Sequence, residues 1–140
     1  MENLFDTAKQ LAALVEARSR AMKVPVTISV VDTHGNLVLK HRIDWAPLIS
    51  LEMAERKAYT AALLEMRTED ITSQAQPGQP MFTITSVSGG RFVAFGGGAP
   101  LYSDGALVAG VGVSGGTTEQ DIEILEAALA GVRNRPPEPS

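Results

Sequence analysis

Hydrophobic residues near both ends of the chain recur with helical spacing. From Leu4 to Met22, apolar side chains share one face of a helix that ends before Pro25. Near the C-terminus, Thr117 with Gln120 three residues later forms a capping-box pattern, and apolar residues follow at helical intervals. The pattern predicts an amphipathic helix at each end, packed on a sheet.

A third helix is predicted in the middle of the chain. Pro47 suits a first helical turn, and the segment SLEMAERKAYTAALLEM at 50–66 carries a narrow stripe of small residues. The stripe consists of Leu51, Ala54, Ala58, Ala61 and Ala62. Such a helix can lie very close to the surface on which it packs. Residues 68–76 are expected to add a short helical turn before the irregular segment QPGQP.

Alternating β-branched and apolar residues predict five strands joined by tight turns. The predicted strands cover residues 24–32, 36–42, 81–87, 91–97 and 106–113. Turns at 33–35, 88–90 and 103–105 contain Gly, Asn, Asp or Ser, as tight turns require. Neighbouring strands linked by such short turns pair antiparallel.

These elements follow the order α-β-β-α-β-β-β-α. The order predicts an α+β fold in which helices pack on a five-stranded antiparallel sheet. Residues 1–133 are expected to form one domain, and residues 134–140 a flexible C-terminal tail.

The composition excludes several classes of protein. The chain has 140 residues and no cysteine, so it has no disulfide framework, thiolate nucleophile or cysteine-ligated metal. Its net charge of -4, without a basic run, excludes a nucleic-acid binder. No segment is apolar enough to span a membrane, and we expect a cytoplasmic protein.

Glycine is concentrated between residues 96 and 121, which hold eight of the thirteen glycines. Gly110 and Gly112 share one face of the last predicted strand, where their lack of a side chain would let a helix backbone approach. Gly97 and Gly98, shortly before Pro100, suggest instead a place where a ligand comes close to the backbone.

The segment Ser114-Gly115-Gly116 precedes the closing helix. Free N–H groups at a helix start can hold an anion or a carboxylate, although Thr117 as a plain helix cap explains the pattern equally well. The segment also matches GxSxG, the motif of a nucleophilic serine in hydrolases. Both histidines precede Ser114 and the predicted sheet is antiparallel, so we reject hydrolase chemistry.

Charged and imidazole groups supply further candidates. Lys57, with Thr60 near it, could face an anionic ligand, or Lys57 could form an ordinary ion pair. His34 and His41 are the candidate haem ligands. A weaker hypothesis is that Glu52 and Glu55, three residues apart on a helix, hold a metal ion.

Four segments together resemble a known family. VVDTHGNLV, SLEMAERKAYTAALL, GGGAPLY and AGVGVSGGTTEQD resemble the haem-degrading or haem-binding family that includes GlcG, HbpS and the C-terminal domain of PduO-type corrinoid adenosyltransferases. The resemblance extends from the first helix to Ile122 and implies a profilin-like α+β domain. Trp45 stands where members commonly have glycine, and it is a candidate oligomer contact.

The resemblance implies a homo-oligomer, a dimer, tetramer or octamer, that binds a small molecule. The ligand would be noncovalent haem or a corrinoid, and the protein would be accessory to a cobalamin-dependent diol or glycerol pathway or a glycolate pathway. The alternatives are a haem-degrading enzyme and a purely structural accessory subunit. The adenosyltransferase activity of PduO-type proteins belongs to a separate domain, which we expect this chain to lack.

Overall fold

The computed structural model describes residues 3–139 of the chain. Its helices and strands are α1 (Leu4–Met22), β1 (Thr27–Val31), β2 (Leu37–Arg42), α2 (Ser50–Leu64), α3 (Thr68–Gln74), β3 (Gly98–Ser103), β4 (Ala106–Ser114) and α4 (Thr118–Ala130). Two short 3-10 helices lie at Ile84–Ser86 and Ser88–Gly90. The three long helices and the short α3 confirm the predicted helices.

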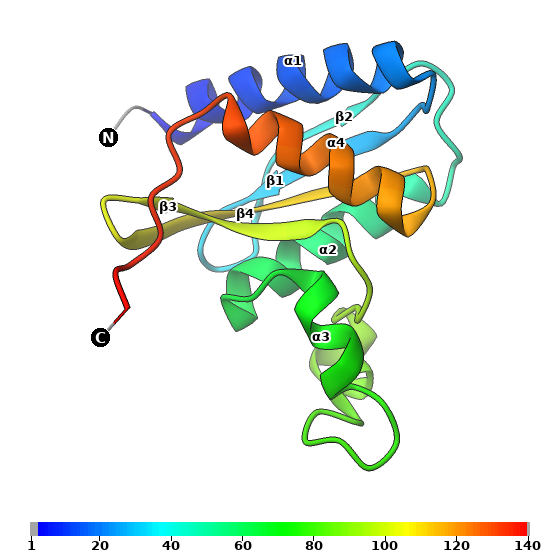
Figure 1. The fold of residues 1–140 in the computed structure, drawn as a ribbon, viewed down its shortest axis with the longest axis vertical. Helices are drawn as coiled ribbons and strands as arrows, with labels where there is room; N and C mark the ends of the chain where they lie inside the picture. Colours follow the sequence, from blue (N-terminus) through cyan, green and yellow to red (C-terminus); the bar gives the residue numbers. More distant parts are fainter. Residues whose placement is uncertain (1–2, 140) are drawn as a thin grey trace.

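The strands form one antiparallel sheet in the order β2-β1-β4-β3. Helices α1 and α4 cover one face of the sheet, and α2 crosses the other face (Figure 1). The α+β prediction, with helices packed on an antiparallel sheet, is therefore confirmed.

The predicted number of strands is wrong, because the sheet has four strands and not five. Residues 81–97, expected to form a hairpin, consist of turns and the two 3-10 helices. The outer edge of β3 also leaves little room for another strand. Thr68 Oγ1 accepts from Gly98 N at 2.8 Å, and Asn134 Oδ1 accepts from Tyr102 N at 2.8 Å. Side chains thus occupy the hydrogen-bonding positions that an added strand would need.

The two faces of the sheet are packed in different ways. On the face of α1 and α4, large aliphatic side chains form the main core. Its fully buried members include Leu11, Val15, Ile28, Val30, Val111 and Ile124. On the face of α2, a Cβ at Gly112 would overlap the carbonyl oxygen of Ala54, and one at Gly110 would overlap that of Ala58. These two glycines therefore let α2 lie directly on β4, as predicted.

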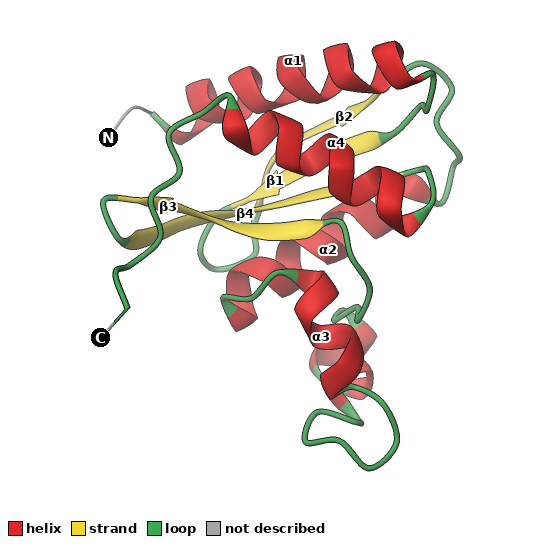
Figure 2. Ribbon diagram, in the orientation of Figure 1, coloured by secondary structure: helices red, strands yellow, loops and turns green. Residues whose placement is uncertain are grey.

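Beyond α2 the chain leaves the sheet. Helix α3 and the segment that follows it project below α2, away from α1 and α4 (Figure 2). Phe82 and Val87 in this projection are about half exposed. Within residues 3–139, no helix combines the length and the apolar character needed to cross a membrane.

Candidate functional site

Lys57 lies on the side of α2 that faces the sheet, and its side chain is only 1% exposed. Its Nζ atom lies 3.0 Å from Asp121 Oδ2 and donates to the carbonyl oxygen of Val113, also at 3.0 Å. The ammonium lies 5.3 Å from the centre of the Phe95 ring. The lysine predicted either to face an anion or to form an ion pair is thus paired with a carboxylate of its own chain.

Asp121, in the first turn of α4, completes this buried cluster. Its Oδ1 atom accepts a hydrogen bond from Gly116 N at 2.9 Å. Burial lowers the pKa of Lys57 and raises the pKa of Asp121, because both charged forms lose water, and each charge partly offsets the shift of the other. The pair joins α2, the end of β4 and α4.

The predicted ligand-binding glycines surround the same cluster. A Cβ at Gly97, whose φ is +120°, would lie 2.8 Å from Lys57 Nζ, and one at Gly98 would lie 2.6 Å from the Lys57 carbonyl oxygen. At Gly115, a Cβ would lie 2.5 Å from the carbonyl oxygen of Pro25. In each case the neighbour is part of the protein, and the two cavities described below are lined by other residues.

Three further predicted residues are Thr60, Pro100 and Ser114, of which Thr60 hydrogen bonds to the backbone. Thr60 Oγ1 accepts from Val93 N at 3.0 Å and donates to the Arg56 carbonyl oxygen at 2.7 Å. Pro100 lies in β3 opposite Gly110, and Ser114 ends β4 opposite Thr27. The structure therefore brings Lys57 together with Gly97, Gly98 and Gly116, while Thr60 and Pro100 lie elsewhere along α2 and β3.

The two histidines lie far apart on the first hairpin. His34 is exposed in the β1–β2 turn, where its backbone N–H donates to Asp32 Oδ1 at 2.9 Å. His41 lies in β2, and its Nε2 is 2.9 Å from Glu16 Oε1 on α1. This hydrogen bond is the main cause of the lowered pKa of Glu16. The two imidazoles therefore do not converge on one site.

An open cavity of about 470 Å³ lies against the outer side of α2, and we call it the α2 cavity. Its lining includes Gly35, Lys40, Glu52, Glu55, Arg56, Tyr59 and Arg91. Three of these side chains are cationic and two are anionic, so the lining has one excess positive charge. Gly35 belongs to the turn that also carries His34.

Ion pairs and hydrogen bonds orient the charged groups of the α2 cavity. Lys40 Nζ lies 2.8 Å from Glu55 Oε1, and Arg56 Nε lies 3.3 Å from Glu52 Oε2. Arg56 also donates to the Gly90 carbonyl oxygen at 2.7 Å. The Glu55 and Arg56 side chains of α2 are thereby each held by a partner outside the helix, Lys40 and the Gly90 carbonyl oxygen.

An aromatic ring and a second guanidinium complete the lining. Arg91 lies over the ring of Tyr59, 4.4 Å from its centre, and its guanidinium donates to Ser88. The Tyr59 hydroxyl hydrogen bonds to the Ser88 hydroxyl. These contacts fix a planar cation on a buried aromatic surface.

Sequence reasoning missed Lys40, Arg56, Tyr59 and Arg91 as site residues. A signal existed for two of them, because Glu52, Arg56 and Tyr59 recur at the spacing that places side chains on one face of a helix. Arg91 follows an irregular segment, and its position depends on how that segment folds back to α2.

The glutamates proposed as metal ligands each have a cationic partner. Glu52 is paired with Arg56, and Glu55 with Lys40. Within residues 3–139 there is no group of three or more Asp, Glu, His or Cys side chains placed to hold a metal ion. Metal binding at Glu52 and Glu55 would require both ion pairs to open.

Comparison with known proteins identifies relatives over nearly the whole chain. The family described as haem degrading protein HbpS-like matches residues 5–130. The corrinoid adenosyltransferase PduO of Citrobacter freundii is 39% identical over 131 residues, which make up 94% of this chain and 39% of that protein. The chain therefore spans about two fifths of the length of this relative.

Solved structures show the same fold. A crystal structure of a PduOC:haem complex superposes with a TM-score of 0.91 at 36% identity, covering 96% of this chain and 97% of the other. A crystal structure of HbpS superposes with a TM-score of 0.85 at 27% identity, covering 96% and 92% of the two chains. The resemblance found in the sequence is confirmed.

Proposed function

The chain belongs to the HbpS-like family, and from this premise we propose that it is a small-molecule-binding protein that holds haem noncovalently in the α2 cavity. The observation that carries the proposal is the convergence of Lys40, Arg56 and Arg91 on one open cavity beside the Tyr59 ring. The structural relative named as a haem complex supports the choice of ligand.

The residues of the α2 cavity fit the chemistry of haem. Its two propionate groups are carboxylates, which guanidinium groups bind well because they donate two parallel hydrogen bonds. The volume of about 470 Å³ lies in the range of small-molecule sites. His34, one residue from Gly35 in the cavity lining, offers an exposed imidazole. Bound haem would supply an iron centre that an imidazole can ligate.

The protein would hold the guanidinium groups of Arg56 and Arg91 in position before the ligand binds. Arg56 is fixed by Glu52 and the Gly90 carbonyl, and Arg91 by Ser88 and Tyr59. A ligand carboxylate that enters would therefore find oriented donors and would cost little side-chain entropy. The ion pairs of Glu52 with Arg56 and of Glu55 with Lys40 would weaken when these cations bind the ligand.

Haemin titration followed at the Soret band tests this proposal. We expect a defined shift that saturates for the unaltered protein. Arg56→Met and Arg91→Met should each weaken binding roughly tenfold, since each removes a charge-assisted hydrogen bond. His34→Ala should change the spectrum if this imidazole ligates iron. Arg18→Met is the matched control, because Arg18 pairs with Glu123 on the other face of the sheet.

Two results would overturn the assignment. If both arginine variants bind haemin with unchanged affinity, haem does not bind in the α2 cavity. If the unaltered protein shows no Soret shift, the alternative of a structural accessory subunit is favoured. Adding a reductant and oxygen separates a binder from the alternative of a haem-degrading enzyme. A binder keeps its pigment, whereas an enzyme destroys haem with turnover.

We also propose an accessory role beside a cobalamin-dependent diol or glycerol system, supported by the PduO relatives. Competition between cobalamin and haemin for the protein tests whether the ligand is a corrinoid.

We further propose a homo-oligomer in which Trp45, 88% exposed, makes a contact between subunits. Light scattering of Trp45→Ala should then show a smaller particle.

A further inference from the structure

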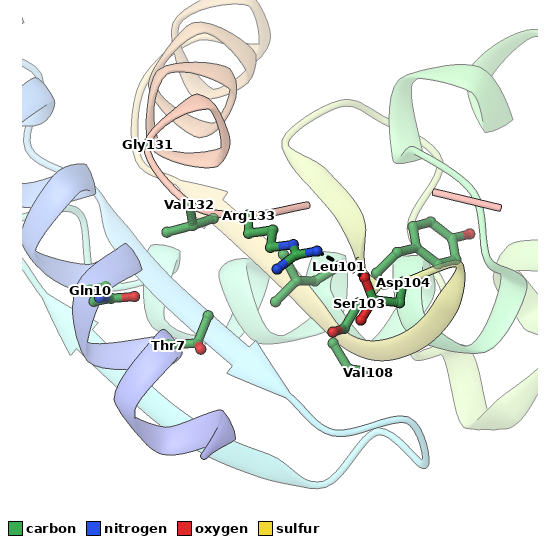
Figure 3. A pocket seen from close by; sticks show the side chains of 10 residues that line it. Thr7, Gln10, Leu101, Ser103, Asp104, Val108, Gly131, Val132 and Arg133 are labelled. Carbon is green, nitrogen blue, oxygen red and sulfur yellow. Dashed lines mark hydrogen bonds and ion pairs between the residues drawn. The ribbon is translucent and has the colours of Figure 1, made fainter. Parts of the chain in front are cut away.

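A second cavity lies on the opposite face of the sheet, between α1, the end of α4 and the β3–β4 turn (Figure 3). We call it the hairpin cavity, lined among others by Thr7, Gln10, Leu101, Ser103, Val108 and Arg133. Its volume of about 350 Å³ is within the range of small-molecule sites, and the haem proposal makes no use of it.

The floor of the hairpin cavity is apolar. Leu101 is 1% exposed and belongs to the main core, against which Val108 and Val132 also pack. A ligand with a short hydrocarbon part could therefore bury it there, and the gain would follow the apolar area removed from water.

The wall formed by α1 is polar and has unused hydrogen-bonding capacity. Thr7 is 9% exposed and lines the cavity, and within residues 3–139 no group hydrogen bonds to its hydroxyl or to the Gln10 side chain. Both lie across the cavity from Arg133 and Ser103 (Figure 3). A hydroxyl and an amide each offer a donor and an acceptor. A ligand or water that enters the cavity can therefore hydrogen bond to the Thr7 hydroxyl and to the Gln10 amide.

The charges at the hairpin cavity cancel. Arg133 Nη2 lies 3.1 Å from Asp104 Oδ1, and a dashed line marks this pair in Figure 3. Thr7, Gln10 and Ser103 are neutral. We propose that the hairpin cavity is a second binding site, for a small uncharged molecule with hydroxyl or amide groups on a short apolar skeleton.

The wall opposite α1 is held in place by the chain that leaves α4. Asn134 Oδ1 accepts from Tyr102 N at 2.8 Å, and Arg135 N donates to the Tyr102 carbonyl oxygen at 3.3 Å. The Arg135 carbonyl oxygen in turn accepts from Gly105 N at 3.1 Å. The site is therefore formed before a ligand arrives, which lowers the cost of binding.

Proton–nitrogen NMR spectra of the whole chain test this site, with acetamide as the probe and acetate as its anionic equivalent of similar shape. Acetamide should shift the signals of Thr7, Ser103 and the Gln10 side-chain amide and should saturate, while acetate should bind at least tenfold more weakly. Thr7→Val keeps the shape and removes the hydroxyl, so it should weaken acetamide binding roughly three- to tenfold. Thr7→Ser should restore it.

Three results would overturn the proposal: no saturating shift at these residues, equal binding of acetate, or unchanged affinity in Thr7→Val. If Thr7→Val does not fold, Gln10→Leu repeats the test at an exposed position. Haemin titration of the same variants should match that of the unaltered protein. A negative acetamide result would therefore not affect the haem proposal. Unchanged haemin affinity in Arg56→Met would likewise not affect the proposal for the hairpin cavity.

Discussion

Arg56 and Lys57 are neighbours in α2, yet their side chains leave the helix in different directions and lie in different surroundings. Lys57 points toward the sheet, where a carboxylate and a backbone carbonyl of the protein take up its charge. Arg56 points to the α2 cavity, which is open to solvent. The Lys57 ammonium is paired inside the protein, whereas the Arg56 guanidinium, paired with Glu52 and bonded to the Gly90 carbonyl oxygen, lines a cavity that is open to solvent.

The energetic consequences of these two positions differ. Removing one partner of a buried ion pair leaves a charge without water or counter-charge, which typically costs about 3–5 kcal/mol. Exposed pairs such as that of Arg56 with Glu52 contribute about 0–1 kcal/mol. Variants at Lys57, on the inner side of α2 that faces the sheet, should therefore change stability, whereas variants at Arg56, on the outer side that faces the α2 cavity, should change binding.

Lys57→Met should cause the largest loss of stability, because it removes the cation of the buried ion pair. It leaves Asp121 buried without its counter-charge, and we expect the free energy of unfolding to fall by about 3–5 kcal/mol. The double variant Lys57→Met with Asp121→Leu should recover most of this loss, because no charge is then left buried. Urea denaturation measures both.

Lys40→Met is the matched control for that experiment, since Lys40 pairs with Glu55 at the surface and should cost about 0–1 kcal/mol. If Lys57→Met proved as mild as this control, the buried pair would not hold the inner side of α2 together.

Gly112→Ala tests how closely α2 lies on β4. Its Cβ would overlap the Ala54 carbonyl oxygen, a backbone atom that cannot rotate away, so we expect a loss of about 2–3 kcal/mol in unfolding free energy. Gly78→Ala is the control, because its Cβ meets no atom within 4 Å and reports only the cost of a positive φ, about 1 kcal/mol. Equal losses in the two variants would contradict the close packing.

Local patterns predicted the parts of the fold that depend on neighbours in sequence. The turn at Gly35, the capping box at Thr117 and the close approach of α2 to Gly110 and Gly112 were all predicted and are confirmed. Each depends on a few residues whose backbone needs are visible in the sequence.

Features that depend on distant segments were not predictable in the same way. Residues 81–97 alternate like a strand, but the outer edge of β3 is occupied by Thr68 and Asn134, and the local sequence does not reveal this. The partner of Lys57 is 64 residues away in α4. Arg91 reaches the α2 cavity only because an irregular segment returns to it.

Asp32→Asn weakens the turn that borders the outer side of α2. Asp32 accepts hydrogen bonds from the backbone N–H groups of Asn36 and His34, and the first of these is the main cause of its lowered pKa. A carboxylate with a lowered pKa stabilises the fold above its unfolded pKa of about 3.9, and this stability is lost as the pH falls toward the folded value. The loss at pH 7 should resemble that of a helix cap, about 1 kcal/mol.

Urea denaturation between pH 7 and pH 3 measures this effect. The gap in stability between the unaltered protein and Asp32→Asn should narrow below about pH 4, where the Asp32 carboxyl is protonated first in the unfolded state and, at a lower pH, in the folded state. A gap that stayed constant over this range would mean that the carboxylate does not support the turn.

Arg56→Met gives the smallest expected change in stability and completes the comparison. Its ion pair with Glu52 is partly exposed, so the free energy of unfolding should change by about 0–1 kcal/mol, while haemin affinity should fall roughly tenfold. Lys57→Met should show the reverse, a large loss of stability with haemin affinity unchanged in the fraction that remains folded. Denaturation and haemin titration on the same preparations measure both quantities. If Arg56→Met lost as much stability as Lys57→Met, the outer side of α2 would also be committed to the fold, and its cations would not be free for a ligand.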